Sequence, residues 1–225
     1  MAIEKPKAII FDIIETVFAL DSVRPSLVAL GLQPGDLDTW FAFGLRDAFT
    51  LNATQSISPF PEILKSALTQ LLAKRGLDPA EEDRRRVFEA MRSMPPHKDA
   101  AEALGLLKED GVPLYALSNG ARASTKSLLE QVGLTDFFTD ILSVETIAQF
   151  KPSKPVYDHG VAATGLAADQ VMLIATHAWD CHGAKAAGLK AAFVARGQAY
   201  PDVMLAPDLT GNELVDVARA ITALE

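Results

Sequence analysis

Polar side chains that can do chemistry stand where the predicted buried strands of this sequence end. They are Asp12, Ser118, Asn119, Lys151, His177 and Asp180. The carboxyl ends of parallel strands lie at one edge of an open α/β sheet, and ligands bind in the crevice outside that edge. If the strands are adjacent and parallel, these side chains converge on one site.

The presence of an acid and a base at that edge indicates nucleophilic catalysis. A carboxylate and an ammonium that share a partly buried position form an ion pair, which keeps Asp12 ionised beside Lys151. An ionised carboxylate is a nucleophile that can form a covalent intermediate. The hydroxyl of Ser118 and the amide of Asn119 can hold an anionic group or a leaving group.

Apolar runs predict the strands that position these residues. Such runs fill positions 7–13, 112–118, 138–144, 171–176 and 190–195. Helical patterns lie between strands, as in "ASTKSLLEQVGL" and "AWDCHGAKAAGL", whose Gly-Leu ends resemble glycine helix stops. Strands and helices that alternate at this spacing predict an α/β fold with a parallel sheet covered on both faces.

The stretch after the first strand breaks this alternation. Residues 18–95 contain helical patterns such as "PEILKSALTQLLAKRG" and no convincing strand. The sequence therefore predicts a core domain made of residues 1–17 and 96–225, with an all-helical cap domain of residues 18–95 inserted after the first strand. The segment "MPPHKDA" is the expected return linker.

Four motifs resemble those of the haloacid dehalogenase (HAD) superfamily, and most closely its L-2-haloacid dehalogenase branch. The family patterns FDxxGT, SNG, FKPxxxVY and SxNAWDxxGA correspond here to "FDIIET", "SNG", "FKPSKPVY" and "ATHAWDCHGA". The match covers nearly the whole chain. It implies a HAD-like Rossmannoid parallel sheet core with an inserted all-helical cap. It also implies hydrolytic dehalogenation of small 2-haloalkanoic acids, giving a 2-hydroxy acid and halide.

The resemblance implies catalytic roles for residues of three motifs. Asp12 would displace halide and form an ester, Thr16 would orient its loop, and Lys151 would be its ion-pair partner. Asp180 would help to position the hydrolytic water.

Other residues are expected to contact the substrate. The resemblance places Ser118 at the substrate carboxylate, Asn119 near the halide, and Tyr157 in support of this region. Phe41 is expected either to line the pocket or to face the core, and Trp179 to pack between core and cap. The family's habit also suggests a homodimer.

Two substitutions separate this chain from the phosphohydrolases of the superfamily. Those enzymes carry a second Asp two residues after the nucleophile, where Ile14 cannot protonate an alkoxide leaving group. They hold Mg²⁺ with an acid pair where this chain has Ala175 and Thr176, and a hard cation needs several oxygen ligands. We therefore expect no metal and no cofactor. The alternatives are a phosphohydrolase that binds Mg²⁺ at a degenerate site and a catalytically silent binding protein.

Two departures from the family pattern predict a base for ester hydrolysis. Glu15 replaces the Gly of FDxxGT, and His177 replaces the Asn of SxN. The two loops should leave neighbouring strands, so Glu15 and His177 can form a hydrogen-bonded pair that raises the basicity of the imidazole. His177 would then take a proton from the water that hydrolyses the Asp12 ester. The alternative is a solvated Glu15 beside a structural His177.

A third departure concerns recognition of the substrate carboxylate. The arginine that the family places after a cap tryptophan is absent, because Trp40 is followed by Phe41. Arg46 lies on the same predicted helix, more than one turn beyond Phe41. We expect Arg46 to bind substrate if that helix is tilted toward the site.

Charge and composition narrow the range of partners. The 225 residues carry a net charge of −8, which disfavours nucleic acid and an anionic membrane surface. No stretch approaches the ~20 apolar residues that a membrane span needs. Cys181 is the single cysteine, which favours a reducing compartment. We expect a cytoplasmic protein whose partner is a small anionic 2-haloacid.

Overall fold

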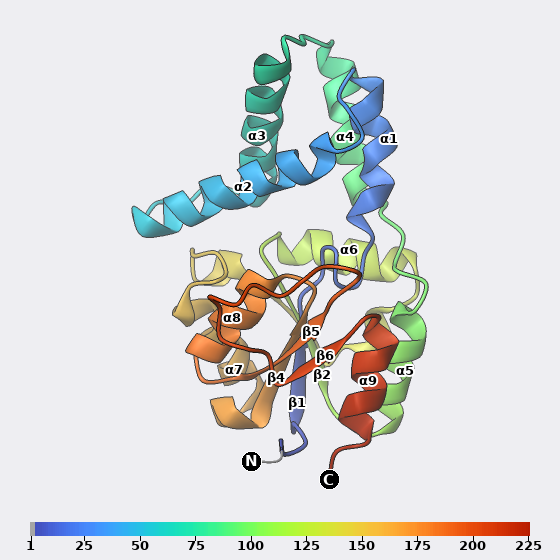
Figure 1. The fold of residues 1–225 in the computed structure, drawn as a ribbon, viewed down its shortest axis with the longest axis vertical. Helices are drawn as coiled ribbons and strands as arrows, with labels where there is room; N and C mark the ends of the chain where they lie inside the picture. Colours follow the sequence, from blue (N-terminus) through green and yellow to red (C-terminus); the bar gives the residue numbers. More distant parts are fainter. Residues whose placement is uncertain (1–2) are drawn as a thin grey trace.

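The computed structural model describes residues 3–225, and its centre is a parallel sheet (Figure 1). The sheet has six strands in the order β3-β2-β1-β4-β5-β6, and each neighbouring pair is parallel. The strands are β1 (Ala8–Phe11), β2 (Leu114–Ser118), β3 (Asp140–Ser143), β4 (Val171–Ala175), β5 (Lys190–Val194) and β6 (Leu209–Gly211). The α/β fold class predicted from the sequence is confirmed.

The edge strand β6 is the one strand that the sequence does not predict. Its three residues, Leu-Thr-Gly, lie at the end of the sheet beside β5, and none of them is fully buried. A strand this short has no run of buried apolar residues. Its pattern is therefore that of a loop.

The central strand β1 positions the predicted nucleophile, Asp12, which directly follows it. All four residues of Ala8–Phe11 are buried, and β2 and β4 pair with β1 on either side. Phe11 aligns with Ala116 of β2 and with Ile174 of β4. Because these strands end at nearly the same level, the residues that follow them leave the sheet side by side.

Helices cover both faces of the sheet (Figure 1). On one face lie α5 (Ala100–Glu109) and α9 (Leu214–Thr222), and on the other lie α7 (Lys154–Thr164) and α8 (Ala178–Ala186). Helix α6 (Arg122–Gln131) contacts β3. Among residues 3–225, none of the helices combines the length and the apolar character that crossing a membrane requires.

The helices between β1 and α5 stand over the carboxyl edge of the sheet, apart from its faces (Figure 1). They are α1 (Arg24–Ala29), α2 (Asp36–Ala53), α3 (Phe60–Arg75) and α4 (Glu81–Arg92), with the short 3-10 helix η1 (Leu20–Val23) before them. The buried indole of Trp40 on α2 donates a hydrogen bond to the carbonyl oxygen of Leu64 on α3, at 2.9 Å. We keep residues 18–95 as the proposed cap, and 1–17 with 96–225 as the proposed core.

One side chain of the proposed cap ties α2 to the core. Asn52, in the last turn of α2, accepts a hydrogen bond from the backbone N–H of Phe150 at 2.8 Å. Its amide nitrogen donates to the carbonyl oxygen of Phe150 at 2.7 Å. Phe150 directly precedes Lys151, so α2 of the proposed cap holds the backbone beside the expected partner of Asp12.

Candidate active site

Lys151 lies between two carboxylates at the carboxyl end of β1. Its Nζ donates hydrogen bonds to Asp12 Oδ1 and to Asp180 Oδ2, each at 2.7 Å. The side chains of Lys151 and Asp180 have no exposed surface, whereas the side chain of Asp12 keeps 8%. Of these three residues, Asp12 is the one that lines the neighbouring cavity.

The charges of this cluster keep Asp12 ionised. Burial alone would raise the pKa of the Asp12 carboxyl, but the charge of Lys151 and a hydrogen bond from His177 outweigh it. They hold that pKa well below its usual range. Burial would likewise lower the pKa of Lys151, but the charges of Asp12 and Asp180 raise it above its usual value. The nucleophile and its partner are therefore both charged at neutral pH.

Asp180 and Tyr157 support the ion pair from inside the core. The hydroxyl of Tyr157 donates a hydrogen bond to Asp180 Oδ1 at 2.6 Å, and Lys151 Nζ donates one to Oδ2 of the same carboxylate. Neither Asp180 nor Tyr157 lines the cavity. The structure therefore connects both side chains to Lys151 through Asp180, outside the cavity lining. The roles expected for Asp180 in positioning the water and for Tyr157 at the substrate remain predictions.

Thr16 fixes the second oxygen of Asp12. Its Oγ1 donates to Asp12 Oδ2 at 2.8 Å and accepts a hydrogen bond from the backbone N–H of Thr176 at 3.0 Å. The nucleophile is thereby connected to the end of β4. This arrangement fits the orienting role that the resemblance implied for Thr16.

His177 bridges Asp12 and Glu15. Its Nδ1 lies 3.2 Å from Asp12 Oδ2, and its Nε2 lies 2.6 Å from Glu15 Oε2. Burial alone would lower the pKa of His177, but the hydrogen bonds to Asp12 and Glu15 outweigh it and raise that pKa to about 10. The predicted pair is therefore brought together. The resting ring, however, is an imidazolium that donates from both nitrogens and has no free lone pair for a proton.

The backbone of Glu15 adopts an unusual conformation. Its φ of 67° lies in the left-handed region, which glycine adopts freely and other residues avoid. This left-handed conformation explains why the family pattern FDxxGT has glycine at the position of Glu15. The loop is held by a hydrogen bond from His97 Nε2 to the carbonyl oxygen of Glu15, at 2.9 Å, and by one from Glu15 N to Phe18 O, at 2.8 Å. It aims the Glu15 carboxylate at His177.

Aromatic rings from the proposed cap and core stack on His177. The ring centroid of Phe41 lies 6.0 Å from that of His177, and the centroid of Trp179 lies 5.1 Å from it. Both rings are within 27° of parallel to the imidazole. Phe41 comes from α2 and Trp179 from α8, and both line the cavity. Of the two expectations for Phe41, the pocket-lining one holds.

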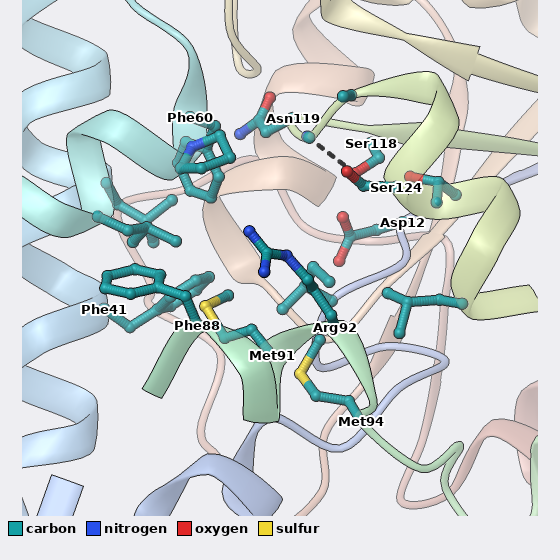
Figure 2. Close-up of a pocket in the computed structure, with 18 of the residues that line it drawn as sticks. Asp12, Phe41, Phe60, Phe88, Met91, Arg92, Met94, Ser118, Asn119 and Ser124 are labelled. Atoms are coloured by element: carbon teal, nitrogen blue, oxygen red, sulfur yellow. Dashed lines mark hydrogen bonds between the residues drawn. The ribbon is translucent and has the colours of Figure 1, made fainter. Parts of the chain in front are cut away.

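A cavity of about 440 Å³ lies between the helices of the proposed cap and the carboxyl edge of the sheet (Figure 2). Asp12, Ser118 and Asn119 all line it, and Figure 2 shows Asp12 and Ser118 on one side, with the Asn119 side chain next to Phe60. The Oγ of Ser118 accepts a hydrogen bond from Gly120 N at 2.9 Å, so its hydroxyl hydrogen is available to an anion. The Oδ1 of Asn119 accepts from Lys151 N at 2.9 Å, so its Nδ2 is the atom offered to a ligand.

Arg46 does not reach this cavity. Its side chain is 53% exposed, forms an ion pair with Asp47 at 2.7 Å, and donates to Gln70 Oε1 at 2.7 Å. Its guanidinium also lies over the ring of Phe43, 4.6 Å from the centroid. The structure thus places Arg46 outside the cavity lining, and its expected contact with substrate remains a prediction.

Arg92 lines the cavity although the sequence analysis did not single it out. It is the last residue of α4 and is exposed, and Figure 2 shows its guanidinium between Asp12 and the rings of Phe41 and Phe60. Within residues 3–225, this guanidinium forms no hydrogen bond or ion pair. The helix "EEDRRRVFEAMR" has the composition of a solvated surface helix. The sequence feature that could have pointed to Arg92 is its position just before the segment that returns the chain to the predicted core.

The side chains at the site do not suit a divalent cation. Across the described residues 3–225, no group of three or more His, Cys, Asp or Glu side chains is placed to hold a metal ion. The ammonium of Lys151 stands between Asp12 and Asp180, at 2.7 Å from each. Ile14 supplies no side-chain oxygen nearby. We therefore assign no metal ligands.

The chain matches the profile of the haloacid dehalogenase-like hydrolases over residues 6–188. It belongs to the haloacid dehalogenase-like hydrolase family. Haloacetate dehalogenase H-2 of Moraxella sp. (strain B) is 27% identical over 210 residues, which cover 92% of this chain and 94% of that protein. The (S)-2-haloacid dehalogenase of Xanthobacter autotrophicus is 29% identical over 194 residues, which cover 84% and 75%.

A solved structure of the L-2-haloacid dehalogenase from Xanthobacter autotrophicus has the same fold as this haloacid dehalogenase-like hydrolase. Its TM-score is 0.85 at 25% identity, covering 98% of this chain and 100% of that one. The resemblance to the L-2-haloacid dehalogenase branch, first seen in the four motifs, is confirmed by these relatives.

Proposed function

We propose that this protein hydrolyses small 2-haloalkanoic acids through an ester on Asp12, giving a 2-hydroxy acid and halide. The observation that carries the proposal is the position of Asp12, which is ionised and faces a mainly apolar cavity while Lys151 holds it from behind. A nucleophile in such a cavity meets little competing water. The relatives, a haloacetate dehalogenase and an (S)-2-haloacid dehalogenase, support the same chemistry.

In the first step, a carboxylate oxygen of Asp12 attacks the carbon that carries the halogen. The C–O bond forms as the carbon–halogen bond breaks, and halide leaves with the electron pair. Halide is a weakly basic leaving group, so the step needs no general acid, which fits Ile14 at the phosphohydrolase acid position. The Xanthobacter autotrophicus enzyme has been solved with chloropropionic acid covalently bound.

Formation of the ester changes the charge around His177. It removes the negative charge of Asp12 beside Nδ1, while Glu15 remains hydrogen-bonded to Nε2. With one of these carboxylates neutralised, the pKa of the ring falls and His177 can release its Nδ1 proton to solvent. The neutral ring can then act as the base for a water molecule beside the ester carbonyl.

In the second step, that water attacks the ester carbonyl carbon of Asp12. The bond between this carbon and the product oxygen then breaks, so the product hydroxyl keeps an oxygen that began in Asp12. One proton of the water ends on the product hydroxyl and the other on His177, which restores the imidazolium. The proton released earlier to solvent is the acid that hydrolysis of a haloacid produces.

We assign the substrate carboxylate to Arg92, Ser118 and Asn119. Arg92 contributes a guanidinium to the lining of the cavity, and Ser118 and Asn119 contribute a hydroxyl hydrogen and an amide nitrogen. A guanidinium fork matches the two oxygens of a carboxylate. This set takes the role that the sequence analysis gave to Arg46 and Ser118.

The geometry favours this function over the two alternatives. A phosphohydrolase needs an acid for the leaving alkoxide and oxygen ligands for Mg²⁺. Ile14 stands where that acid would act, and Ala175 and Thr176 stand where the acid pair that holds Mg²⁺ would be. A silent binding protein has no need for a buried ion pair at the end of β1. Catalysis without a cofactor, a homodimer and a cytoplasmic location remain part of the proposal on the grounds of the sequence.

A single turnover in heavy-oxygen water tests the proposal directly. With enzyme in excess over (S)-2-chloropropionate, the label should enter Asp12 and the lactate hydroxyl should stay unlabelled. Peptide mass spectrometry locates the label, and halide release is followed with and without EDTA. Label in the product during this first turnover would overturn the ester mechanism.

Two controls complete this experiment. Asp12→Ala should release no halide, because neither Lys151 nor His177 can attack along the same line. EDTA should leave the rate unchanged. Loss of halide release in EDTA with recovery in Mg²⁺ would instead support the phosphohydrolase-like metal site.

A further inference from the structure

The cavity beside Asp12 is larger than a short haloacid needs. Its volume of about 440 Å³ lies in the range in which proteins enclose drug-sized ligands. A 2-halopropionate has only a few non-hydrogen atoms, all of which the polar side of the cavity can accommodate. Most of the remaining wall is formed by apolar side chains.

Aromatic rings form a wall opposite the nucleophile. Figure 2 shows Phe41, Phe60 and Phe88 across the cavity from Asp12. Phe41 and Phe60 pack edge to face with centroids 6.4 Å apart, and Phe88 packs edge to face on the buried Trp40 at 6.1 Å. Each ring is therefore held by another aromatic ring, so the wall is formed before any ligand binds.

Helix α4 presents a cation and an apolar surface on one face. Phe88, Met91 and Arg92 are three and four residues apart, so their side chains lie next to one another. All three line the cavity, as do Met94 beyond the end of α4 and Leu128 on α6. Methionine side chains adapt to ligands of different shape. A ligand that meets this face must carry an anionic group next to a hydrocarbon group.

We infer that the preferred substrates are 2-haloacids whose 2-substituent is a hydrocarbon chain of several carbons, with the carboxylate at Arg92 and the chain against Phe88, Met91 and Leu128. The inference rests on the proposed function and names the substrate class of that site. Each methylene buried in such a wall increases kcat/KM by roughly fourfold until the cavity is filled.

A series of (S)-2-bromo acids from propionate through butanoate and hexanoate to octanoate tests this inference. The value of kcat/KM should rise by roughly fourfold per methylene over the first members of the series. A flat or falling series, with halide released throughout, would overturn the inference and leave the proposed function intact. Absence of halide release from every member would instead count against the proposed function.

A cavity-filling variant and a matched control locate the effect. Met91→Trp should lower the ratio of hexanoate to propionate kcat/KM by at least about tenfold, because the larger ring takes the space of the chain. Glu89→Trp, on the exposed side of the same helix, should leave that ratio unchanged. Equal ratios in the wild type and Met91→Trp would place the chain elsewhere and reject the assignment to α4.

Binding without chemistry separates this inference from the dehalogenation step. Hexanoate and octanoate lack a halogen and should bind the wild-type protein more tightly than propionate, in calorimetry, by the same factor per methylene. Met91→Trp should remove this gain. Equal affinities for all three acids would overturn the inference whether or not halide is released from any bromo acid.

Discussion

The Nε2 atom of His177 lies 2.6 Å from Oε2 of Glu15, while Nδ1 of the same ring faces Asp12 Oδ2 at 3.2 Å. The imidazolium therefore stabilises the nucleophile before the reaction. In the proposed mechanism, loss of the Asp12 charge frees it to act as a base only after the ester has formed. The order of the two steps is thus set by the charges around one ring.

His177→Asn should slow ester hydrolysis more than ester formation. The variant lacks the proposed base but retains Asp12 and Lys151, so halide should be released in a burst of about one equivalent per site. The adduct on Asp12 should then be visible by intact mass spectrometry. Turnover equal to that of the wild type, with no burst and no adduct, would remove His177 from the mechanism.

The stability of the protein should depend on pH through His177. The pKa of its ring is raised from 6.5 to about 10 in the folded state. A raised pKa contributes stability that is fully present below about pH 6.5 and is lost as pH rises toward and through 10. The Tm difference between the wild type and His177→Gln should therefore shrink between pH 6.5 and 10. A difference that grows over this range would contradict the bridged imidazolium.

Glu15→Gly and Glu15→Ala should separate the backbone of this residue from its carboxylate. Both variants lose the hydrogen bond to His177, and both should show slow ester hydrolysis. Only alanine keeps the cost of a left-handed φ of 67°. The glycine variant should be more stable by about 1 kcal/mol in urea unfolding. Equal stabilities would mean that the loop relaxes when the carboxylate is removed.

Arg92→Ala should weaken substrate binding, and Arg46→Ala is its matched control on the proposed cap. Loss of a charge-assisted contact costs about 1.5–3 kcal/mol, so KM should rise by roughly one to two decades in the first variant. Steady-state kinetics of Arg46→Ala should match those of the wild type. The reverse pattern would restore the assignment made from the sequence.

The central features of the fold follow from local patterns. The segments that form β1, β2 and β4 are continuous runs of mainly apolar residues, and Asp12 and Ser118 were found because they stand at the ends of such runs. β6 is too short and too exposed to leave a pattern, and α5 begins inside the segment interpreted as a linker. The position of β6 and the start of α5 depend on packing against residues far apart in the chain, which the spacing of residues in the sequence does not reveal.

The site residues that could be predicted from the sequence are those that directly follow a predicted strand. Glu15 and His177 were paired correctly because their loops leave neighbouring strands. Arg92 was missed because its place depends on how α4 docks over the sheet, which involves residues far apart in the chain. The charge of His177 was also missed, since it depends on two carboxylates and burial together.

The two hydrogen bonds between Asn52 and Phe150 connect the position of helix α2 to the ion pair of the nucleophile Asp12. Any lifting of the C-terminal end of α2 must break both of them, at the residue that precedes Lys151. The backbone of Lys151 would then be held mainly from the core side, by Asn119. Lifting α2 to open the cavity would thus loosen Lys151, the counter-ion of the nucleophile. The Asp12 carboxylate is therefore fully stabilised by its ion pair only while α2 is docked on the core.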